Sequence, residues 1–307
     1  MTAAPLPKEV CLTEVGPRDG LQNERGFVPT QDKLAFIEQL VEAGVTRLEV
    51  GSFVSPKWVP AMADTAELFQ KLRRKPGVKY IALVPNPKGM EAALANRVAD
   101  IAVFTAASES FTKKNINATI EESLANIQQV VSTARREGMW VRGYLSTCFG
   151  CPYEGRVAPD QVLRVTRRLL DIGIDELSIG DTIGVATPNQ VTELVARLRQ
   201  EISLDQIALH FHDTRGTALA NVLAGLQAGV AKFDSSAGGL GGCPYAPGAS
   251  GNLASEDLLY LLQGMGIETG IDLGKVVQAS QLISRSLGRA LPSRYLQAHL
   301  SQISRQP

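Results

Sequence analysis

Residues 42–51 read EAGVTRLEVG, and two later stretches follow the same pattern: 171–180 read DIGIDELSIG and 227–236 read QAGVAKFDSS. Each places a glycine where a helix would end in a left-handed turn, and each continues as a short alternating strand. Apolar residues at helical spacing precede all three stretches. The pattern therefore predicts a helix, a glycine turn and a strand that recur along the chain.

Extended over the whole chain, this pattern predicts eight strands, near residues 10–15, 46–51, 79–84, 99–104, 140–146, 175–180, 206–211 and 232–236. Strands that alternate with helices imply a parallel sheet with right-handed crossovers. Eight such units in about 265 residues fit a (β/α)8 TIM barrel, an α/β fold of roughly 250 residues. The alternative is an open doubly wound sheet, which usually has a glycine-rich phosphate turn after its first strand; residues 15–20 (VGPRDG) are not such a turn.

The strand pattern stops after about residue 267. Residues 278–288 predict a helix, and Pro292 interrupts the helical pattern beyond them. We therefore expect a TIM-barrel catalytic domain over residues 1–266 and a helical extension over 267–307 that packs on the barrel.

The composition excludes several classes of protein. Among 307 residues, 31 basic and 31 acidic side chains cancel, which argues against nucleic acid or an anionic membrane as the main partner. No run of 18 apolar residues is present, and the first residues do not resemble a targeting peptide. Four cysteines in a chain of this length do not make a disulfide scaffold. We expect a soluble, cytoplasmic protein.

Ionisable residues recur where the predicted strands end. Arg18 and Asp19 end the first strand, Glu49 lies in the second, Asp181 ends the sixth, and residues 210–213 (HFHD) end the seventh. Active sites of TIM barrels lie at the carboxyl ends of the strands. The convergence predicts a catalytic site there.

His210 and His212 are two residues apart on a strand, so their side chains point the same way. With Phe211 facing the helices, both imidazoles face the barrel axis, where Asp19 and the amide oxygen of Asn252 complete a metal site. Such a site with open positions suits Mg²⁺ or Mn²⁺, and the same ligands suit non-haem Fe(II). The alternative is a hydrogen-bonded pair of core histidines.

The cysteines differ in their expected roles. Cys148 and Cys151 have no second pair beside them for a closed zinc site, so we interpret them as loop packing, and Cys11 as a core strand residue. Cys243 lies in a glycine-rich loop at the active end, where a thiol serves as proton donor or nucleophile.

Arg18 and Glu49 are expected to act together. A fixed guanidinium next to a metal ligand can stabilise an enolate oxygen. The alternative for Arg18 is a non-catalytic role in a surface salt bridge. Glu49 sits in an apolar strand, where an unpaired carboxylate is costly, so we expect it to pair with Arg18 and orient it.

Six motifs resemble one family, the hydroxymethylglutaryl-CoA lyases of bacterial type, within the metal-dependent TIM-barrel group that includes the isopropylmalate, citramalate and homocitrate synthases. The motifs are residues 15–24 (VGPRDGLQNE), 111–117 (FTKKNIN), 180–184 (GDTIG), 210–214 (HFHDT), 239–246 (GLGGCPYA) and 250–257 (SGNLASED). The resemblance covers essentially the whole chain, and the cysteine loop separates the lyases from the condensing synthases.

The resemblance implies retro-Claisen cleavage of (S)-3-hydroxy-3-methylglutaryl-CoA to acetyl-CoA and acetoacetate. It assigns the metal ligands to Asp19, His210, His212 and Asn252, enolate stabilisation to Arg18, and protonation of the carbanion to Cys243. Glu49 and Asp181 match further active-site acids, and the base that removes the hydroxyl proton is Asp19, His210 or Asp181. Candidate substrate and CoA contacts are Gln22, Lys113, Lys114 and Asn115. The alternative for the two lysines is that they are solvated surface residues without a binding role.

Other interpretations remain open at this point. Related bacterial lyases act on larger 3-hydroxy-3-isoprenoid-glutaryl-CoA substrates, and a condensing synthase, a 2-oxoglutarate-dependent Fe(II) oxygenase or a non-enzymatic binding barrel are further alternatives. We expect a homo-oligomer, either a dimer or a tetramer.

Overall fold

The computed structural model describes residues 5–24, 26–241 and 251–303. Its centre is a closed barrel of eight parallel strands in sequence order. The strands are β1 (Cys11–Glu14), β2 (Arg47–Ser52), β3 (Lys79–Leu83), β4 (Asp100–Ala106), β5 (Trp140–Ser146), β6 (Glu176–Asp181), β7 (Ile207–Phe211) and β8 (Lys232–Ser235). The barrel closes where β1 pairs with β8, from Cys11 opposite Lys232 to Glu14 opposite Ser235. The predicted TIM barrel is confirmed.

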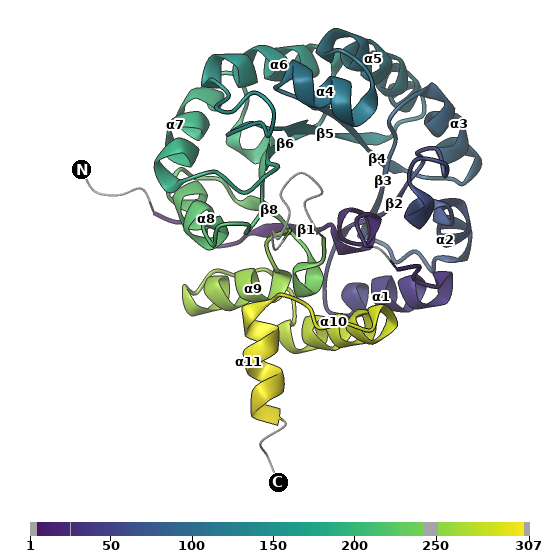
Figure 1. The fold of residues 1–307 in the computed structure, drawn as a ribbon, viewed down its shortest axis with the longest axis vertical. Helices are drawn as coiled ribbons and strands as arrows, with labels where there is room; N and C mark the ends of the chain where they lie inside the picture. Colours follow the sequence, from purple (N-terminus) through teal and green to yellow (C-terminus); the bar gives the residue numbers. More distant parts are fainter. Residues whose placement is uncertain (1–4, 25, 242–250, 304–307) are drawn as a thin grey trace.

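Helices surround the barrel, as Figure 1 shows. They are α1 (Thr30–Glu42), α2 (Thr65–Lys71), α3 (Pro87–Ala95), α4 (Glu109–Ile116), α5 (Ile120–Arg136), α6 (Pro159–Ile172), α7 (Pro188–Leu198), α8 (Ala218–Gln227), α9 (Ser255–Gly264), α10 (Leu273–Leu287) and α11 (Arg294–Ile303). Short turns are η1 (Gly16–Gly20), η2 (Pro60–Met62), η3 (Leu204–Gln206) and η4 (Ala237–Gly239). In the described ranges, no helix is both long enough and apolar enough to cross a membrane.

The three repeated stretches form the junctions that their pattern predicts. Gly44, Gly173 and Gly229 have φ angles of 100°, 98° and 92°, a left-handed conformation that a side chain would strain. Each glycine follows its helix closely and precedes a strand, so the chain turns from the outer layer into the barrel at these points.

The repeat also places charged side chains inside the barrel. Three residues after the glycines stand Arg47, Glu176 and Lys232, and Glu176 accepts ion pairs from Arg47 at 2.7 Å and Lys232 at 2.8 Å. Because β2 lies across the barrel from β6, the Arg47–Glu176 pair crosses the interior. Arg142 of β5 reaches Asp234 of β8 within the same interior and is fully buried. We call Arg47, Arg142, Glu176, Lys232 and Asp234 the charged column.

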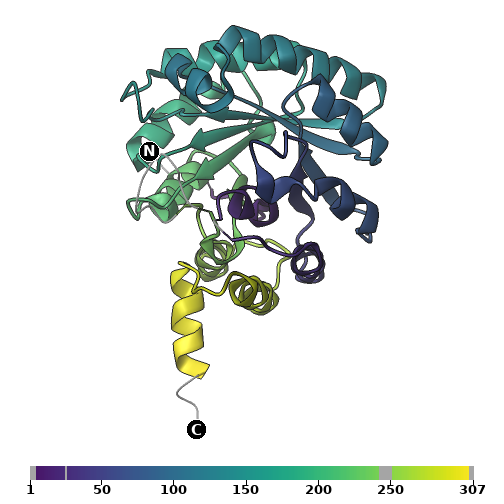
Figure 2. The same ribbon diagram turned by 45° about the vertical axis from the view of Figure 1, so that its right-hand side comes forward.

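The C-terminal helices pack on the first helix of the barrel. The amide of Asp272 donates to the carbonyl of Ala43 at 2.7 Å, and the hydroxyl of Ser286 donates to Asp32 at 2.5 Å. α10 therefore lies against α1, whereas α11 extends away from the barrel (Figures 1 and 2). The helix expected at 278–288 is α10, which begins earlier, at Leu273.

Candidate active site

A π-helical turn carries the first two site residues. β1 ends at Glu14, and η1 follows it, closed by a hydrogen bond from the amide of Gly20 to the carbonyl of Val15 at 3.1 Å. The prediction that Arg18 and Asp19 end the first strand was wrong, because the strand ends at Glu14 and both residues lie in the turn that follows it. Pro17 explains the difference, because it has no N–H for the strand ladder. π-turns of this kind often occur at functional sites.

Arg18 is held in a fixed orientation by two carboxylates. Its Nε donates to Glu49 Oε2 at 2.7 Å, and its Nη1 donates to Asp19 Oδ1 at 2.8 Å. Arg18 is buried and Glu49 is fully buried. Burial lowers the pKa of Arg18, but the charges of Glu49 and Asp19 outweigh it and the pKa is raised, so the guanidinium stays charged. The expected Arg18–Glu49 pair is present.

Asp19, His210 and His212 form a cluster that fits a metal ion. Their ligand atoms all lie within 4.8 Å of one another. His210 Nδ1 lies 3.1 Å from Asp234 Oδ2, so its Nε2 is the nitrogen left for a ligand. Among the described residues, the buried Nδ1 of His212 has no hydrogen-bond partner. Buried polar atoms are nearly always paired, so this one indicates a missing ligand.

Asn252 lies beside this cluster. Its amide nitrogen donates to Asp19 Oδ2 at 2.8 Å and to the carbonyl of Leu240 at 3.1 Å. Its side-chain oxygen is buried and has no partner within the described part of the chain. A carboxylate, two imidazoles and an amide oxygen thus converge, a donor set that suits a hard divalent cation with open positions.

The pKa values favour the ligand forms of two of these groups. Burial raises the pKa of Asp19, but Arg18 and both histidines lower it more, to about 2. Burial and the neighbouring His210 lower the pKa of His212 to about 4. At neutral pH the first is therefore a carboxylate and the second a neutral imidazole, as metal binding requires.

Two glycines allow Asn252 to reach the cluster. Gly241 has a φ of 113°, and a Cβ added there would lie 2.7 Å from the amide nitrogen of Asn252. A Cβ added at Gly251 would lie 1.7 Å from the carbonyl oxygen of Gly241. The chain therefore approaches itself closely at this point. Cys243, a predicted catalytic residue, lies outside the described residues.

Asp181 has a different environment from the cluster. Its carboxylate accepts the amides of Val185 and Ala186 at 2.9 and 3.0 Å, so it holds the loop between β6 and α7. Burial raises its pKa to about 6, although these two hydrogen bonds lower it. The structure thus gives Asp181 a loop-binding contact.

The predicted CoA contacts lie on two elements that follow strands. Lys113, Lys114 and Asn115 are exposed on α4, after β4, and Lys114 Nζ lies 4.6 Å from the centre of the Tyr153 ring. Gln22 follows η1, and in the described ranges its buried Oε1 has no partner. These side chains lie outside the Asp19–His210–His212 cluster.

Cys148 and Cys151 are buried free thiols, as loop packing requires. Ser108 donates to Cys151 Sγ at 3.0 Å, and Cys148 Sγ donates to the carbonyl of Leu145 at 3.0 Å. Cys11 is on β1 but only half-buried, so its placement in the core was wrong. Cys11 is the first residue of β1, at the edge of the barrel, and the rest of the strand is buried.

Asp234 is a functional candidate that the sequence analysis missed. It accepts hydrogen bonds from Ser178 Oγ at 2.9 Å and Arg142, and it contacts His210 Nδ1. A carboxylate bonded to the second ring nitrogen fixes the tautomer and direction of a ligating histidine. The sequence repeat could have identified it, because Asp234 has the same position in the stretch 227–236 as Glu49 has in the stretch 42–51.

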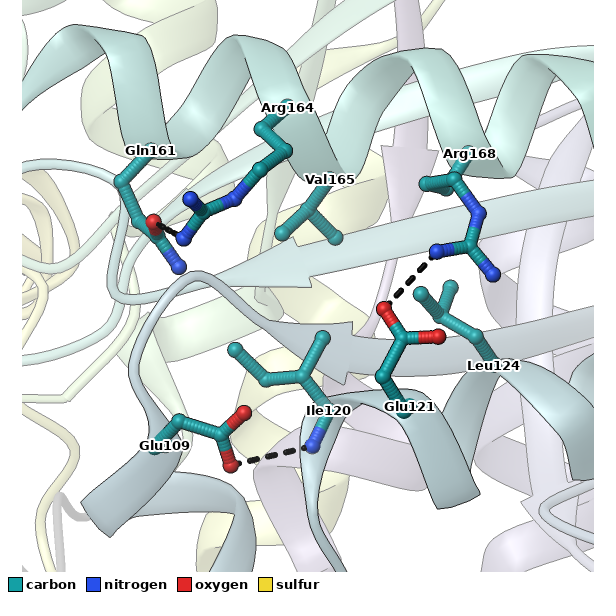
Figure 3. A pocket seen from close by; sticks show the side chains of 8 residues that line it. All are labelled: Glu109, Ile120, Glu121, Leu124, Gln161, Arg164, Val165 and Arg168. Carbon is teal, nitrogen blue, oxygen red and sulfur yellow. Dashed lines mark hydrogen bonds and ion pairs between the residues drawn. The ribbon is translucent and has the colours of Figure 1, made fainter.

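A separate hollow of about 270 Å³ lies on the outer layer, between α6 and the start of α5 (Figure 3). Glu121 pairs with Arg168 at 2.8 Å, and Glu109 accepts the amide of Ile120 at 3.2 Å. Its charged groups thus bond to neighbouring residues, and the predicted catalytic residues lie elsewhere, so this hollow is a groove between helices.

The fold and the site define a TIM-barrel enzyme with a candidate divalent-metal centre at the carboxyl ends of its strands. Residues 9–283 match the family model described as HMGL-like. The chain belongs to this family, the hydroxymethylglutaryl-CoA lyases, as its motifs predicted.

Relatives from mammals and bacteria are about equally similar. The chain is 52% identical over 293 residues to a mitochondrial hydroxymethylglutaryl-CoA lyase of Bos taurus, covering 95% of this chain and 90% of the relative. It is 52% identical over 297 residues to a Pseudomonas aeruginosa protein named 3-hydroxy-3-isohexenylglutaryl-CoA/hydroxy-methylglutaryl-CoA lyase, covering 97% and 99%.

Solved structures agree with the fold. A hydroxymethylglutaryl-CoA lyase from Pseudomonas aeruginosa has a TM-score of 0.95 at 52% identity, covering 97% of this chain and 99% of that one. An HMG-CoA lyase from Acinetobacter baumannii, solved with coenzyme A and 3-methylmalate, has a TM-score of 0.92 at 38% identity and covers 96% of both chains.

Proposed function

We propose that this protein cleaves (S)-3-hydroxy-3-methylglutaryl-CoA to acetyl-CoA and acetoacetate. The observation that carries the proposal is the meeting of Asp19, His210 and His212 beside a buried, fixed Arg18. In such an arrangement the three ligands would hold the metal ion that a hydroxy acid chelates. The guanidinium of Arg18 lies next to them and can stabilise a developing negative charge. The family of the chain and relatives of about 50% identity over nearly its full length support the same reaction.

Asp19, His210, His212 and Asn252 would hold Mg²⁺ or Mn²⁺, and the unpaired atoms of His212 and Asn252 within the described ranges fit this role. When bound, such a cation supplies Lewis acidity, which makes the 3-hydroxyl of the substrate easier to deprotonate. Asp234 keeps His210 in the orientation that this ligand set needs.

Side chains of the protein accept the proton of the 3-hydroxyl and stabilise the negative charge of the enolate. Asp19, His210 and Asp181 are the groups that can accept the hydroxyl proton. As the C2–C3 bond breaks, C3 becomes the ketone of acetoacetate and the electron pair becomes the enolate of acetyl-CoA. Arg18 stabilises the enolate oxygen, and Glu49 prevents the guanidinium from moving away. Cys243 helps to protonate C2.

Binding of the CoA portion involves Gln22, Lys113, Lys114 and Asn115 in this proposal. The lysines are exposed on α4, which follows β4 at the active end of the barrel, and they supply positive charge for phosphate groups. Assembly as a dimer or tetramer, a cytoplasmic location and a separate helical extension from residue 267 stay predictions.

A larger substrate is the second candidate. The Pseudomonas aeruginosa relative is named for both a 3-hydroxy-3-isohexenylglutaryl-CoA and the methyl compound. We therefore include an isohexenyl substrate in the test. The relatives of about 50% identity are named as lyases, which favours a lyase over the condensing synthase and the Fe(II) oxygenase.

The test is release of acetyl-CoA from each substrate by purified protein supplied with Mg²⁺ or Mn²⁺. We expect release from the methyl compound, loss of activity after chelation, and recovery when either ion returns. Asp19→Asn is expected to lose Mn²⁺ binding in a direct titration. Activity on the isohexenyl compound alone would change the substrate, and activity that survives chelation would contradict the metal centre.

A further inference from the structure

Tyr144 lies inside the barrel, between the site and the charged column. It belongs to β5 and to a small apolar cluster with Ile81, Leu83 and Ala102, and it is 7% exposed. The Arg142 guanidinium carbon lies 4.8 Å from the centre of its ring, and that of Arg18 lies 5.7 Å away. The ring also stands edge-on to His210, with 6.2 Å between ring centres.

The hydroxyl of Tyr144 is buried and has no hydrogen-bond partner among the residues that the structure describes. A buried hydroxyl without a partner is disfavoured, and its persistence in a folded protein needs an explanation. Packing alone would be served better by phenylalanine at this position. The hydroxyl is therefore suited to a group that arrives with a ligand.

Tyr80 shows how this chain treats a structural tyrosine. It is 5% exposed on β3 and belongs to the large core cluster, outside the small cluster that contains Tyr144. Its hydroxyl accepts the backbone amide of Lys75 at 3.1 Å. Two tyrosines of similar burial thus differ in whether the hydroxyl has a hydrogen-bond partner, and the unpaired one contacts Arg18 and His210.

We propose that the Tyr144 hydroxyl donates a hydrogen bond to the thioester oxygen that becomes the enolate oxygen during cleavage. The inference rests on the proposed lyase function. Arg18, to which the proposed function assigns this oxygen, contacts the Tyr144 ring, whereas in the same proposal the carboxylate end of the substrate would bind at Asp19, His210 and His212. The hydroxyl keeps its proton throughout, so the step adds one donor to a developing oxyanion and changes no covalent bond.

The test compares Tyr144→Phe with Tyr80→Phe as a matched control. Three quantities are measured: kcat and KM for cleavage, exchange of the methyl hydrogens of acetyl-CoA in D2O, and the midpoint of thermal unfolding. Exchange reports enolate formation without breaking the C2–C3 bond. For Tyr144→Phe we expect kcat and exchange to fall together by about 100-fold, with little change in KM.

Stability separates this role from a structural one. Tyr144→Phe is expected to leave the unfolding midpoint unchanged or to raise it, because no described residue loses a hydrogen bond. Tyr80→Phe is expected to lower the midpoint and to keep wild-type kcat and exchange.

Three results would overturn the inference: wild-type kcat and exchange in Tyr144→Phe, a rise in KM alone, which would indicate a carboxylate contact, or a lowered midpoint that accompanies the loss of activity. A wild-type enzyme that does not cleave the thioester would refute the proposed function. The exchange assay needs only acetyl-CoA, so a wild-type enzyme that exchanges but does not cleave would still decide the role of Tyr144. A wild-type enzyme that neither cleaves nor exchanges would refute both proposals.

Discussion

Glu14→Gln removes a buried charge that joins three parts of the site's frame. Glu14 Oε1 accepts the amides of Gly16 at 2.8 Å and Ala237 at 2.9 Å, and Oε2 accepts the Ser255 hydroxyl at 2.6 Å. It thus connects η1, η4 and the start of α9. Glutamine has the same shape, and its oxygen can keep both amide bonds while its nitrogen faces Ser255.

The expected effect follows from the pKa of Glu14. Burial raises this pKa from 4.5 to about 7, despite the hydrogen bonds that lower it. The folded state therefore binds the proton more tightly than the unfolded state. Its contribution to stability is complete below pH 4.5 and is lost as the pH rises through about 7, a total change of about 3 kcal/mol.

Urea unfolding at pH 5 and pH 8 measures this effect. We expect the free energy of unfolding to decrease more in the wild type than in Glu14→Gln, by about 3 kcal/mol. Glu256, whose pKa burial also raises to about 7, adds to the decrease in the wild type, and the charge of Glu14 contributes to its shift. Removing Glu14 therefore abolishes its own part of the decrease and reduces the part that comes from Glu256.

The exposed Glu137 supplies the control, because Glu137→Gln changes the same charge outside the buried network. It should reproduce the wild-type pH dependence. If Glu14→Gln shows that same dependence as well, the assignment of a strained carboxylate to position 14 is wrong.

Two further substitutions test the metal centre. Asp234→Asn should weaken Mn²⁺ binding about 10- to 100-fold in a calorimetric titration, because His210 loses its carboxylate partner; unchanged affinity would contradict that role. Gly241→Ala should destabilise the fold by about 1–3 kcal/mol in chemical unfolding, since alanine is strained at a φ of 113° and its Cβ meets Asn252. A variant as stable as the wild type would show that the chain relaxes there.

Much of the fold could be predicted from the sequence because two local signals coincide. In the three repeats, a glycine with positive φ ends the helical segment, and strict alternation begins the strand. All eight predicted strands lie within two residues of the observed ones. The barrel also carries the ends of its strands to one face, so the site residues could be grouped from their positions alone.

The remaining features depend on contacts that local patterns do not encode. Alternation cannot reveal the π-turn at Gly16–Gly20, because its geometry depends on a proline and on a hydrogen bond from Gly20 back to Val15, a five-residue spacing that a two-residue period does not contain. Asp234 and Arg142 look like ordinary strand residues until the closed barrel brings β5 and β8 within reach. The unpaired hydroxyl of Tyr144 is defined only by its three-dimensional surroundings.

The charged column has a consequence for how this barrel evolves. Glu176 joins Arg47 and Lys232, and Asp234 joins Arg142 to a histidine of the site. Losing Arg142 or Asp234 deprives a fully buried charge of its opposite partner, which is costly. Substitutions along the column are therefore epistatic, because the cost of replacing one member depends on whether its partner is still present.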